Sequence, residues 1–421
     1  MTEGTDPVDG TPPLGPSTTL ELLTRWPFGP YFWTKLARTT GVWIQNVTSA
    51  VVAYSITGST LAVGLVSTLQ FLAPLLLTLW AGGLTDRYGK VRILLLGQFV
   101  SGSGALTLAI WIGAVGVEGL PGVGPVLAIS LLTGIGFAIT APAMQAIVPL
   151  LVEPRDVGQA VALSSLVINL SRVIGPALGA IALAAGGPAA AYGLNVAGHI
   201  AFIAYLSRIQ RLPSDRTRAR ERTSIRGTLQ LVSERRDVLL AIVMVGVFGF
   251  ATDPTITLTP ELSERLGTGE DGVAVLVTFF GIGSLIAAFG YRRLRQWVDH
   301  EKVVHACLLL QAVSLAGVAL TSSRTLVHAL FLLGGGAFFV GVTSITAFVH
   351  ERIDDEIRGR VMAVWAMAFL GVRPLGALIN GAVGDLAGID VAFVLAASAP
   401  FTMAIIGAVQ RRRTGGWAGT V

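Results

Sequence analysis

The sequence predicts an all-α integral membrane protein with about twelve transmembrane helices in two six-helix, pseudo-repeated halves. Of the 421 residues, 52% are hydrophobic and only 13% are charged, whereas soluble domains carry roughly 25% charged residues. The mean hydropathy is +0.70. The chain also contains a succession of apolar runs, each close to the roughly 20 residues that a helix needs to cross a bilayer. Together these observations exclude a soluble globular protein.

The apolar runs are separated by polar linkers. They cover residues 39–56, 61–81, 91–115, 123–148, 157–185, 189–206, 238–258, 273–291, 303–320, 326–348, 361–383 and 391–409. The sequence therefore predicts a disordered cytoplasmic tail over 1–30, six-helix halves over 31–207 and 238–410, a central cytoplasmic loop over 208–237, and a cytoplasmic tail over 411–421. Weak repetition supports the division, because Arg172 in the fifth run and Arg373 in the eleventh each precede a proline and small residues.

Basic residues are concentrated in the linkers on one side of the predicted membrane. If the N-terminus lies inside, the outer linkers carry only Arg265 and Arg324 among their basic residues. Lysine and arginine accumulate in cytoplasmic loops, so we predict that both termini are cytoplasmic. A high content of alanine, glycine and arginine with very little lysine indicates a bacterial source. The predicted location is therefore the cell (inner) membrane.

The linker between the second and third runs has the order Gly-x-Leu-x-Asp-Arg-x-Gly-Lys-x-Arg. Glycine permits sharp turns and close helix approach, and we expect such an approach at Gly83. Asp86, the only acid of the linker, can pair with a helix N-terminus or an arginine. The loop can act as a latch that holds one conformation, or it can be an ordinary basic turn. The latch motif consists of Gly83, Leu84, Asp86, Arg87, Gly89, Lys90 and Arg92.

This order resembles the loop signature of the major facilitator superfamily, which lies between transmembrane helices 2 and 3. Residues 41–45, 70–74, 142–149, 171–179 and 358–362 resemble the branch that holds enterobactin-exporter-like and drug-exporter-like proteins. The resemblance implies a secondary transporter that exports an amphipathic small molecule, a drug or a siderophore-like compound, by alternating access and against protons.

A second motif lies in the fifth run. Gly175, Pro176 and Gly179 resemble the helix-5 motif of antiporters, which is thought to bend the helix and seal the pore. Pro176 removes a backbone hydrogen bond, and the glycines let neighbouring helices pack closely. A purely structural kink is the alternative interpretation, and the two interpretations are compatible.

Three charged residues fall inside the apolar runs. Charges within a membrane are rare and costly, so Arg172, Asp253 and Arg373 are candidates for function. Arg172 and Arg373 would line a central aqueous cavity, one from each half, and bind an anionic or carbonyl-rich substrate. Asp253, beside the helix-breaking Pro254, would be a counter-ion or a proton-binding group. In the structural alternative both arginines hold helices together through carbonyl and hydroxyl groups.

Polar and aromatic residues at similar depth are further candidates for the substrate or proton pathway. The polar ones are Gln45, Asn46, Asn169, Gln311 and Asn380. They either line water or hold helices together. The aromatic ones are Trp43, Phe71, Trp365 and Phe369. They could form the walls of the cavity, or they could simply pack.

Several function classes are excluded. The single cysteine, Cys307, and five scattered histidines do not form a metal site. No nucleotide-binding motif or nucleophile triad is visible, so we predict neither a cofactor nor an enzyme. The charges flank membrane segments, which excludes nucleic acid as a partner. Many proton-coupled drug exporters of the superfamily that the loop resembles carry an arginine in the fourth helix, but the fourth run here has none. The first run also lacks an acid, so for proton coupling Asp253 is the main candidate and Asp385 the reserve.

The predicted function is export of an amphipathic small molecule by alternating access with proton antiport. The partners would be the substrate, the lipid bilayer and protons, and the functional unit would be a monomer. An importer or a lipid flippase of the same fold is the alternative. A membrane sensor without transport activity is a third hypothesis, and it predicts no solute flux.

Overall fold

The computed structural model describes residues 17–209, 232–353 and 355–414, and these residues form helices and no strands. The elements are α1 (Thr19–Thr24), α2 (Phe28–Thr57), α3 (Thr60–Tyr88), α4 (Lys90–Val115), α5 (Gly124–Ile147), the 3₁₀ turns η1 (Val148–Leu150) and η2 (Pro154–Asp156), α6 (Val157–Arg208), α8 (Arg236–Thr252), α9 (Pro254–Thr257), α10 (Thr259–Arg265), α11 (Gly269–Arg295), α12 (His300–Ala319), α13 (Arg324–Arg352), α14 (Asp355–Ala387) and α15 (Ile389–Thr414). The all-α membrane fold is thus confirmed.

Ten stretches of the described chain are long and apolar enough to span a membrane. One of them contains α6, whose 52 residues are interrupted by non-helical backbone at Gly186 and Gly187. Gly187 has a φ of 65°, which glycine adopts without steric cost. The 30-residue helix α2 is not one of the ten. A count of about twelve crossings therefore stays a prediction.

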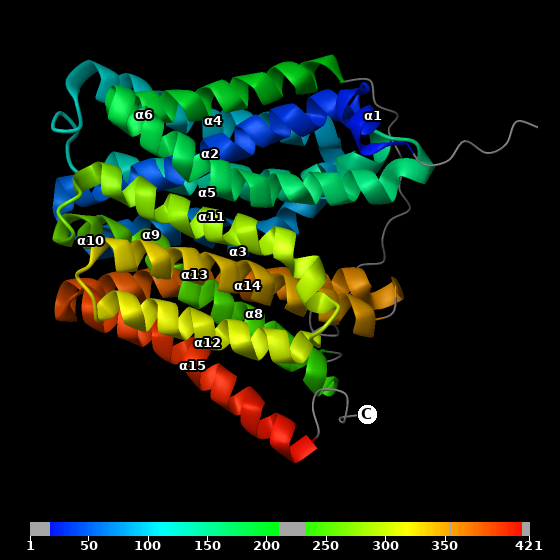
Figure 1. The fold of residues 1–421 in the computed structure, drawn as a ribbon. Helices are drawn as coiled ribbons and strands as arrows, with labels where there is room; N and C mark the ends of the chain where they lie inside the picture. Colours follow the sequence, from blue (N-terminus) through cyan, green and yellow to red (C-terminus); the bar gives the residue numbers. More distant parts are fainter. Residues whose placement is uncertain (1–16, 210–231, 354, 415–421) are drawn as a thin grey trace, which may run out of the picture.

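The helices pack in two groups (Figure 1). We call α2 to α6 the first helix group and α8 to α15 the second helix group. In the view, α2, α4, α5 and α6 lie in the upper part and α8, α12, α13, α14 and α15 in the lower part, while α3 and α11 overlap between them. The second group has one continuous apolar core around Phe248, Phe280 and Phe338. The predicted boundary over 208–237 falls mostly outside the described residues and stays a prediction, as do the tails over 1–16 and 415–421.

The N-terminal region differs from the predicted disordered tail. Helix α1 has a capping box formed by Thr18 and Glu21, which satisfies two backbone donors of its first turn. Helix α2 already begins at Phe28, where Tyr31 and Phe202 pack with ring centroids 6.1 Å apart. The prediction of disorder was therefore wrong for residues 19–30, where Trp26 packs against Tyr205 of α6 with ring centroids 5.8 Å apart.

The structure shortens one predicted turn between helices and confirms one predicted helix break. The turn between the second and third runs is shorter than predicted, because α3 continues to Tyr88 and Gly89 alone separates it from α4. Gly89 has a φ of 86°, a conformation that favours glycine. The predicted break at Pro254 is confirmed, since α8 ends at Thr252 and α9 begins at Pro254.

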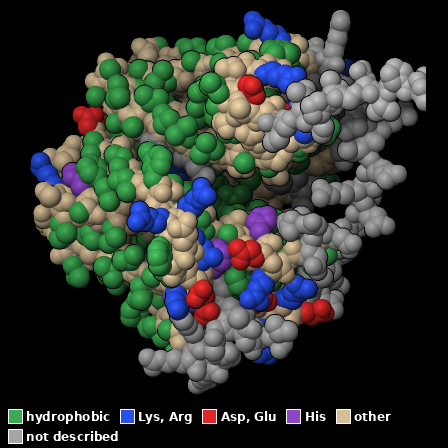
Figure 2. Space-filling view, turned by 45° about the vertical axis from the view of Figure 1, so that its right-hand side comes forward, with side chains coloured by type: hydrophobic (Ala, Val, Ile, Leu, Met, Phe, Trp, Pro, Cys, Tyr) green, Lys and Arg blue, Asp and Glu red, His purple; other side chains and the backbone are tan. Residues whose placement is uncertain are grey.

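The described chain begins and ends at one side of the molecule, drawn at the right in Figure 1, which we call the terminal face. The far face is the opposite side, where Gly58, Gly116 and Gly388 make turns between helices. Figure 2 shows a hollow on the side turned toward the terminal face, between the two helix groups and with hydrophobic side chains on its walls.

Candidate substrate-binding site

Arg172 on α6 lies between two aromatic rings. Its guanidinium carbon is 5.2 Å from the ring centroid of Trp43 on α2 and 5.1 Å from that of Phe338 on α13. Both distances are within the range of cation–π attraction. Its Nε is buried and has no hydrogen-bond partner. Because Phe338 belongs to the second helix group, Arg172 bridges the two groups.

Arg373 on α14, in the second helix group, contacts the first helix group. Only 6% of the residue is exposed, and its guanidinium carbon lies 4.5 Å from the ring centroid of Phe71 on α3. Each arginine therefore contacts an aromatic ring of the other helix group. The two cationic side chains are also close enough to interact electrostatically. The structure thus places one arginine from each helix group at the junction of the two groups, and that they line a central cavity stays a prediction.

Asp253 lies at the break between α8 and α9 and is 3% exposed. Its carboxylate accepts hydrogen bonds from Thr257 Oγ1 and Asn380 Nδ2, both at 3.0 Å. It also interacts electrostatically with Arg373. In this position Asp253 can act as a counter-ion of Arg373, and Asn380 belongs to the same cluster. With Arg172 included, the three charged groups leave an excess of positive charge in a buried location.

Aromatic side chains extend along one face of α14. Trp365, Phe369 and Arg373 follow one another at four-residue spacing, which places them on the same side of a helix. The rings of Trp365 and Phe369 stack with centroids 5.5 Å apart, and Phe369 lies 6.1 Å from Phe338. Trp365 Nε1 is a second buried donor without a partner. The structure thus brings together Trp43, Phe71, Trp365 and Phe369, the four predicted wall residues.

Three of the predicted amides form hydrogen bonds to neighbouring helices. Gln45 on α2 donates to Thr133 Oγ1 on α5 at 2.8 Å and accepts from Asn195 on α6. Asn46 accepts from Gln70 on α3 at 2.9 Å.

The third amide, Gln311 on α12, donates to the carbonyl oxygen of Ala251 at 3.4 Å, next to the break in the seventh run. For Gln45, Asn46 and Gln311 these contacts favour the structural interpretation. The side chain of Asn169 lies outside the described residues.

The helix-5 motif packs closely against α2. A Cβ at Gly175 would lie 2.4 Å from Cβ of Trp43, whereas one at Gly179 would lie 3.7 Å from Ile44. Gly175 is therefore required for the close approach that brings Arg172 beside Trp43. The non-helical residues within α6 are Gly186 and Gly187, so its backbone stays helical at Pro176. The structure supports the packing interpretation of this motif.

The latch motif is only partly described, since the side chain of Asp86 lies outside the described residues. A Cβ at Gly83 would meet none of the described atoms within 4 Å, so a close helix approach at Gly83 stays a prediction. Leu84 is 40% exposed, and the guanidinium of Arg87 lies 5.3 Å from the ring centroid of Tyr88. Gly89 supplies the turn, while Lys90 and Arg92 begin α4.

Contacts at the far face join α3 to α14. Asp385 accepts hydrogen bonds from the backbone N–H of Thr60 at 2.6 Å, from Thr60 Oγ1 at 2.8 Å and from Ser59 Oγ. The carboxylate thus caps the N-terminus of α3, a favourable position for a negative charge. A Cβ at Gly64 would lie 2.3 Å from the carbonyl oxygen of Ala377. The two helix groups are therefore held in backbone contact at this face.

The sequence analysis missed a buried basic cluster in the first helix group. Lys35 donates to Ser164 O at 3.1 Å, and Arg38 Nε donates to Gln98 Oε1 at 3.1 Å. The same Gln98 oxygen lies 2.9 Å from His199 Nδ1. The first predicted run begins only at residue 39, after the charged residues Lys35 and Arg38. Both side chains are buried because α4 and α6 pack around them, which the sequence alone does not show.

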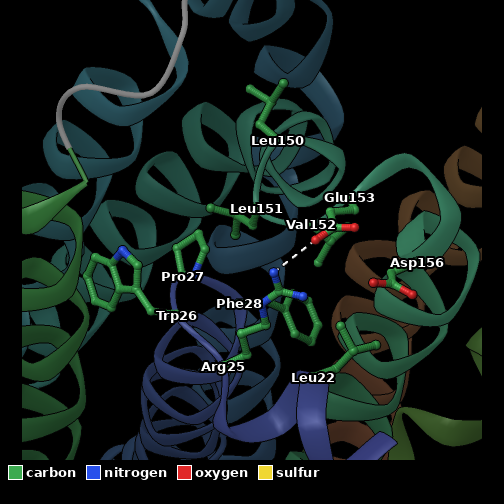
Figure 3. Close-up of a pocket in the computed structure, with 10 residues that line it drawn as sticks. All are labelled: Leu22, Arg25, Trp26, Pro27, Phe28, Leu150, Leu151, Val152, Glu153 and Asp156. Atoms are coloured by element: carbon green, nitrogen blue, oxygen red, sulfur yellow. Dashed lines mark hydrogen bonds and ion pairs between the residues drawn. The ribbon is translucent and has the colours of Figure 1, made fainter. Parts of the chain in front are cut away.

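A small pocket lies at the terminal face, apart from the two central arginines (Figure 3). Its volume is about 240 Å³. Its lining residues come from α1, the start of α2 and the connection between α5 and α6: Leu22, Arg25, Trp26, Pro27, Phe28, Leu150, Leu151, Val152, Glu153 and Asp156. Arg25 and Glu153 form an ion pair of 2.8 Å across it. None of its lining residues comes from the second helix group.

Residues 22–416 match the sequence profile of the transmembrane secretion effector family. The chain belongs to this family. The resemblance to major facilitator transporters that the loop motif indicated is thereby confirmed, together with the expectation that the protein is not an enzyme. Sequence motifs scattered over the whole chain carried that prediction.

Relatives of this family member are transport proteins of other bacteria. It is 25% identical to the staphyloferrin A transporter of Staphylococcus aureus, over 77% of this chain and 81% of the relative. It is also 25% identical to macrolide efflux protein A of Streptococcus pyogenes, over 86% of this chain and 92% of that relative. A shorter match to the enterobactin exporter of Salmonella paratyphi A has 34% identity over 37% of each chain.

Solved structures share the fold of this family member. The D-xylose–proton symporter aligns with a TM-score of 0.70 and 13% identity, covering 90% of this chain and 96% of the symporter. The nucleoside transporter NupG aligns with a TM-score of 0.68 and 11% identity, covering 90% of this chain and 97% of NupG. At these identities the likeness establishes the fold and nothing about the cargo.

Proposed function

We propose that this protein is a secondary active transporter that exports an amphipathic small molecule by alternating access, with proton antiport as the driving reaction. The observation that carries the proposal is the cluster of the half-buried Arg172 and the buried Arg373 and Asp253 at the junction of the two helix groups. Intramembrane charges mark substrate and proton pathways in transporters. Efflux and siderophore-transport proteins among the relatives support a small organic cargo.

In this proposal the structure corresponds to the state open toward the cytoplasm. The terminal face is the basic side of the chain, which the positive-inside rule places in the cytoplasm, and both termini then lie inside. The hollow in Figure 2 admits substrate from that side. Asp385 and Gly64 keep the far ends of α3 and α14 together. Rocking of the two groups would separate these ends and release substrate outside.

Asp253 is the proposed proton carrier. Its carboxylate faces Arg373, Asn380 and Thr257 in the closed environment of the second helix group. A change in water access between the two conformations would change its proton affinity, because burial disfavours the ionised carboxylate whereas a nearby cation favours it. Proton binding from outside and release inside could thereby drive the conformational cycle.

The test uses everted membrane vesicles with an imposed inside-acid pH gradient and a panel of amphipathic drugs and siderophores. We expect one compound class to collapse the gradient in vesicles that contain the protein and to leave empty vesicles unchanged. Accumulation of the same compound inside the everted vesicles would establish export. Movement in the opposite direction would indicate an importer, and cargo taken from the lipid leaflet would indicate a flippase.

The latch motif supplies a separate prediction. We expect Asp86→Asn to reduce transport in everted vesicles at unchanged protein levels, because the substitution removes the only acid of the loop. Asp86→Glu keeps the charge and should retain most activity. If Asp86→Asn transports as well as the wild type, the loop is an ordinary basic turn.

A further inference from the structure

We infer that the central site takes an organic anion, with a carboxylate seated on the edge of Arg172 and an aromatic or apolar body lying along the ring residues of α14. The inference rests on the proposed function, because it takes the junction of the helix groups as the substrate pathway. It adds the charge and shape of the cargo. It also excludes cationic drugs as the main substrates of this site.

The first argument comes from the geometry of Arg172. Trp43 and Phe338 cover its guanidinium at 5.2 and 5.1 Å, while all five N–H donors of a guanidinium lie in its plane. Ring contacts therefore fix the group without using its donors. The Nε donor is buried and unpartnered, and no ion pair joins Arg172 to an acid among the described side chains. A planar carboxylate fits such an edge through two parallel hydrogen bonds.

The second argument comes from the balance of charge. Asp253 offsets Arg373, whereas Arg172 is repelled by Arg373. Arg172 is half-buried in the protein, and a cation without a counter-ion is unfavourable within a membrane. An anionic substrate supplies that counter-ion, and a cationic one would add to the repulsion. Arg172 is therefore the side chain that selects the charge of the cargo, whereas the charge of Arg373 is partly offset by the nearby carboxylate of Asp253.

The third argument comes from the surface beside Arg172. Phe338, Phe369 and Trp365 form a continuous series of rings, with neighbouring centroids 6.1 and 5.5 Å apart. Trp365 Nε1 ends this series as another buried donor without a partner. An oxygen-bearing ring compound would satisfy this donor and stack on the same surface. The two unpartnered donors and the rings between them define an elongated site for an aromatic carboxylate.

Direct binding to the purified full-length chain tests this inference without a proton gradient. The probes are 2-naphthoate, the neutral 2-naphthamide and the cationic 2-naphthylmethylammonium, which share one ring system. Unfolding is followed with a thiol-reactive dye, because the single cysteine, Cys307, is buried in the folded protein. We expect 2-naphthoate to raise the melting temperature in a saturable manner, and the amide and ammonium probes to have little effect.

The variants locate the effect. Arg172→Gln should weaken 2-naphthoate binding by roughly tenfold or more, because it removes a charged hydrogen-bond donor. Arg38→Gln is the matched control, since Arg38 is a buried arginine that bonds Gln98 within the first helix group. It should retain the shift. Arg172→Lys keeps the charge but loses the planar edge, so it should bind with intermediate strength and serves if Arg172→Gln does not fold.

Three results would overturn the inference: an equal or larger shift with the ammonium probe, an unchanged 2-naphthoate shift in both Arg172 variants, or no shift with any probe. Other results would contradict the proposed transport function without contradicting the anion site, and the reverse. Binding of 2-naphthoate without flux of any compound in vesicles would leave the anion site and remove the transporter. Flux of cationic compounds without anion binding would leave the transporter and remove the anion site.

Discussion

Replacing Asp253 by asparagine should reduce proton-coupled transport to the level of empty vesicles while the protein remains folded in the membrane. Asparagine has nearly the shape of a protonated aspartic acid and preserves polar contacts to Asn380 and Thr257. It cannot exchange a proton, so the step that couples the gradient to the conformational change is lost. The measurement is substrate-induced collapse of an inside-acid gradient in everted vesicles, with the amount of protein determined in the same membranes.

Asp299→Asn is the control for this experiment. Asp299 is an acid of the same helix group, but its side chain is 81% exposed and it lies beside Lys302 at the terminal face. Its replacement should leave coupling intact. Full gradient collapse in the Asp253→Asn variant would show that another group carries the proton. Asp385 would then be the next residue to replace.

Replacing Gly64 by alanine should shift the protein toward the state in which the far face is open. A Cβ at this position would lie 2.3 Å from the carbonyl oxygen of Ala377, so α3 and α14 could no longer keep their backbone contact. Overpacking of this kind costs about 1–3 kcal/mol, which corresponds to a roughly 5- to 150-fold shift in the balance of the two states. The cost applies only to the closed far face, because the two helices separate when that face opens.

The shift can be measured as a distance between spin labels at Thr57 and Leu386, one from each helix group, in a Cys307→Ser background. Leu386 is 87% exposed, and both positions lie at the far face. Gly64→Ala should lengthen the distance. Gly193→Ala is the matched control, because a Cβ at Gly193 on α6 would meet no atom within 4 Å. An unchanged distance in Gly64→Ala would mean that the far face tolerates the extra atom and that this contact does not set the balance.

The sequence by itself determined the membrane class, the family and the three central charges. An apolar run of bilayer length leaves few alternatives to a helix, so the spans were visible from composition alone. A charge inside such a run is rare enough to stand out, and Arg172, Asp253 and Arg373 were identified on that ground. The loop motif added the family, because the order of its residues is specific.

Only the tertiary structure decided which side chains meet. Phe338 carried no signal in an apolar run, yet it covers one face of Arg172. Asp385 caps α3 although the two lie more than 300 residues apart in the chain, and Lys35 and Arg38 are buried only because α4 and α6 surround them. Composition and periodicity predict whether a single segment faces lipid or water. Contacts between distant segments depend on how the helices pack, and therefore appear only when the helices are assembled.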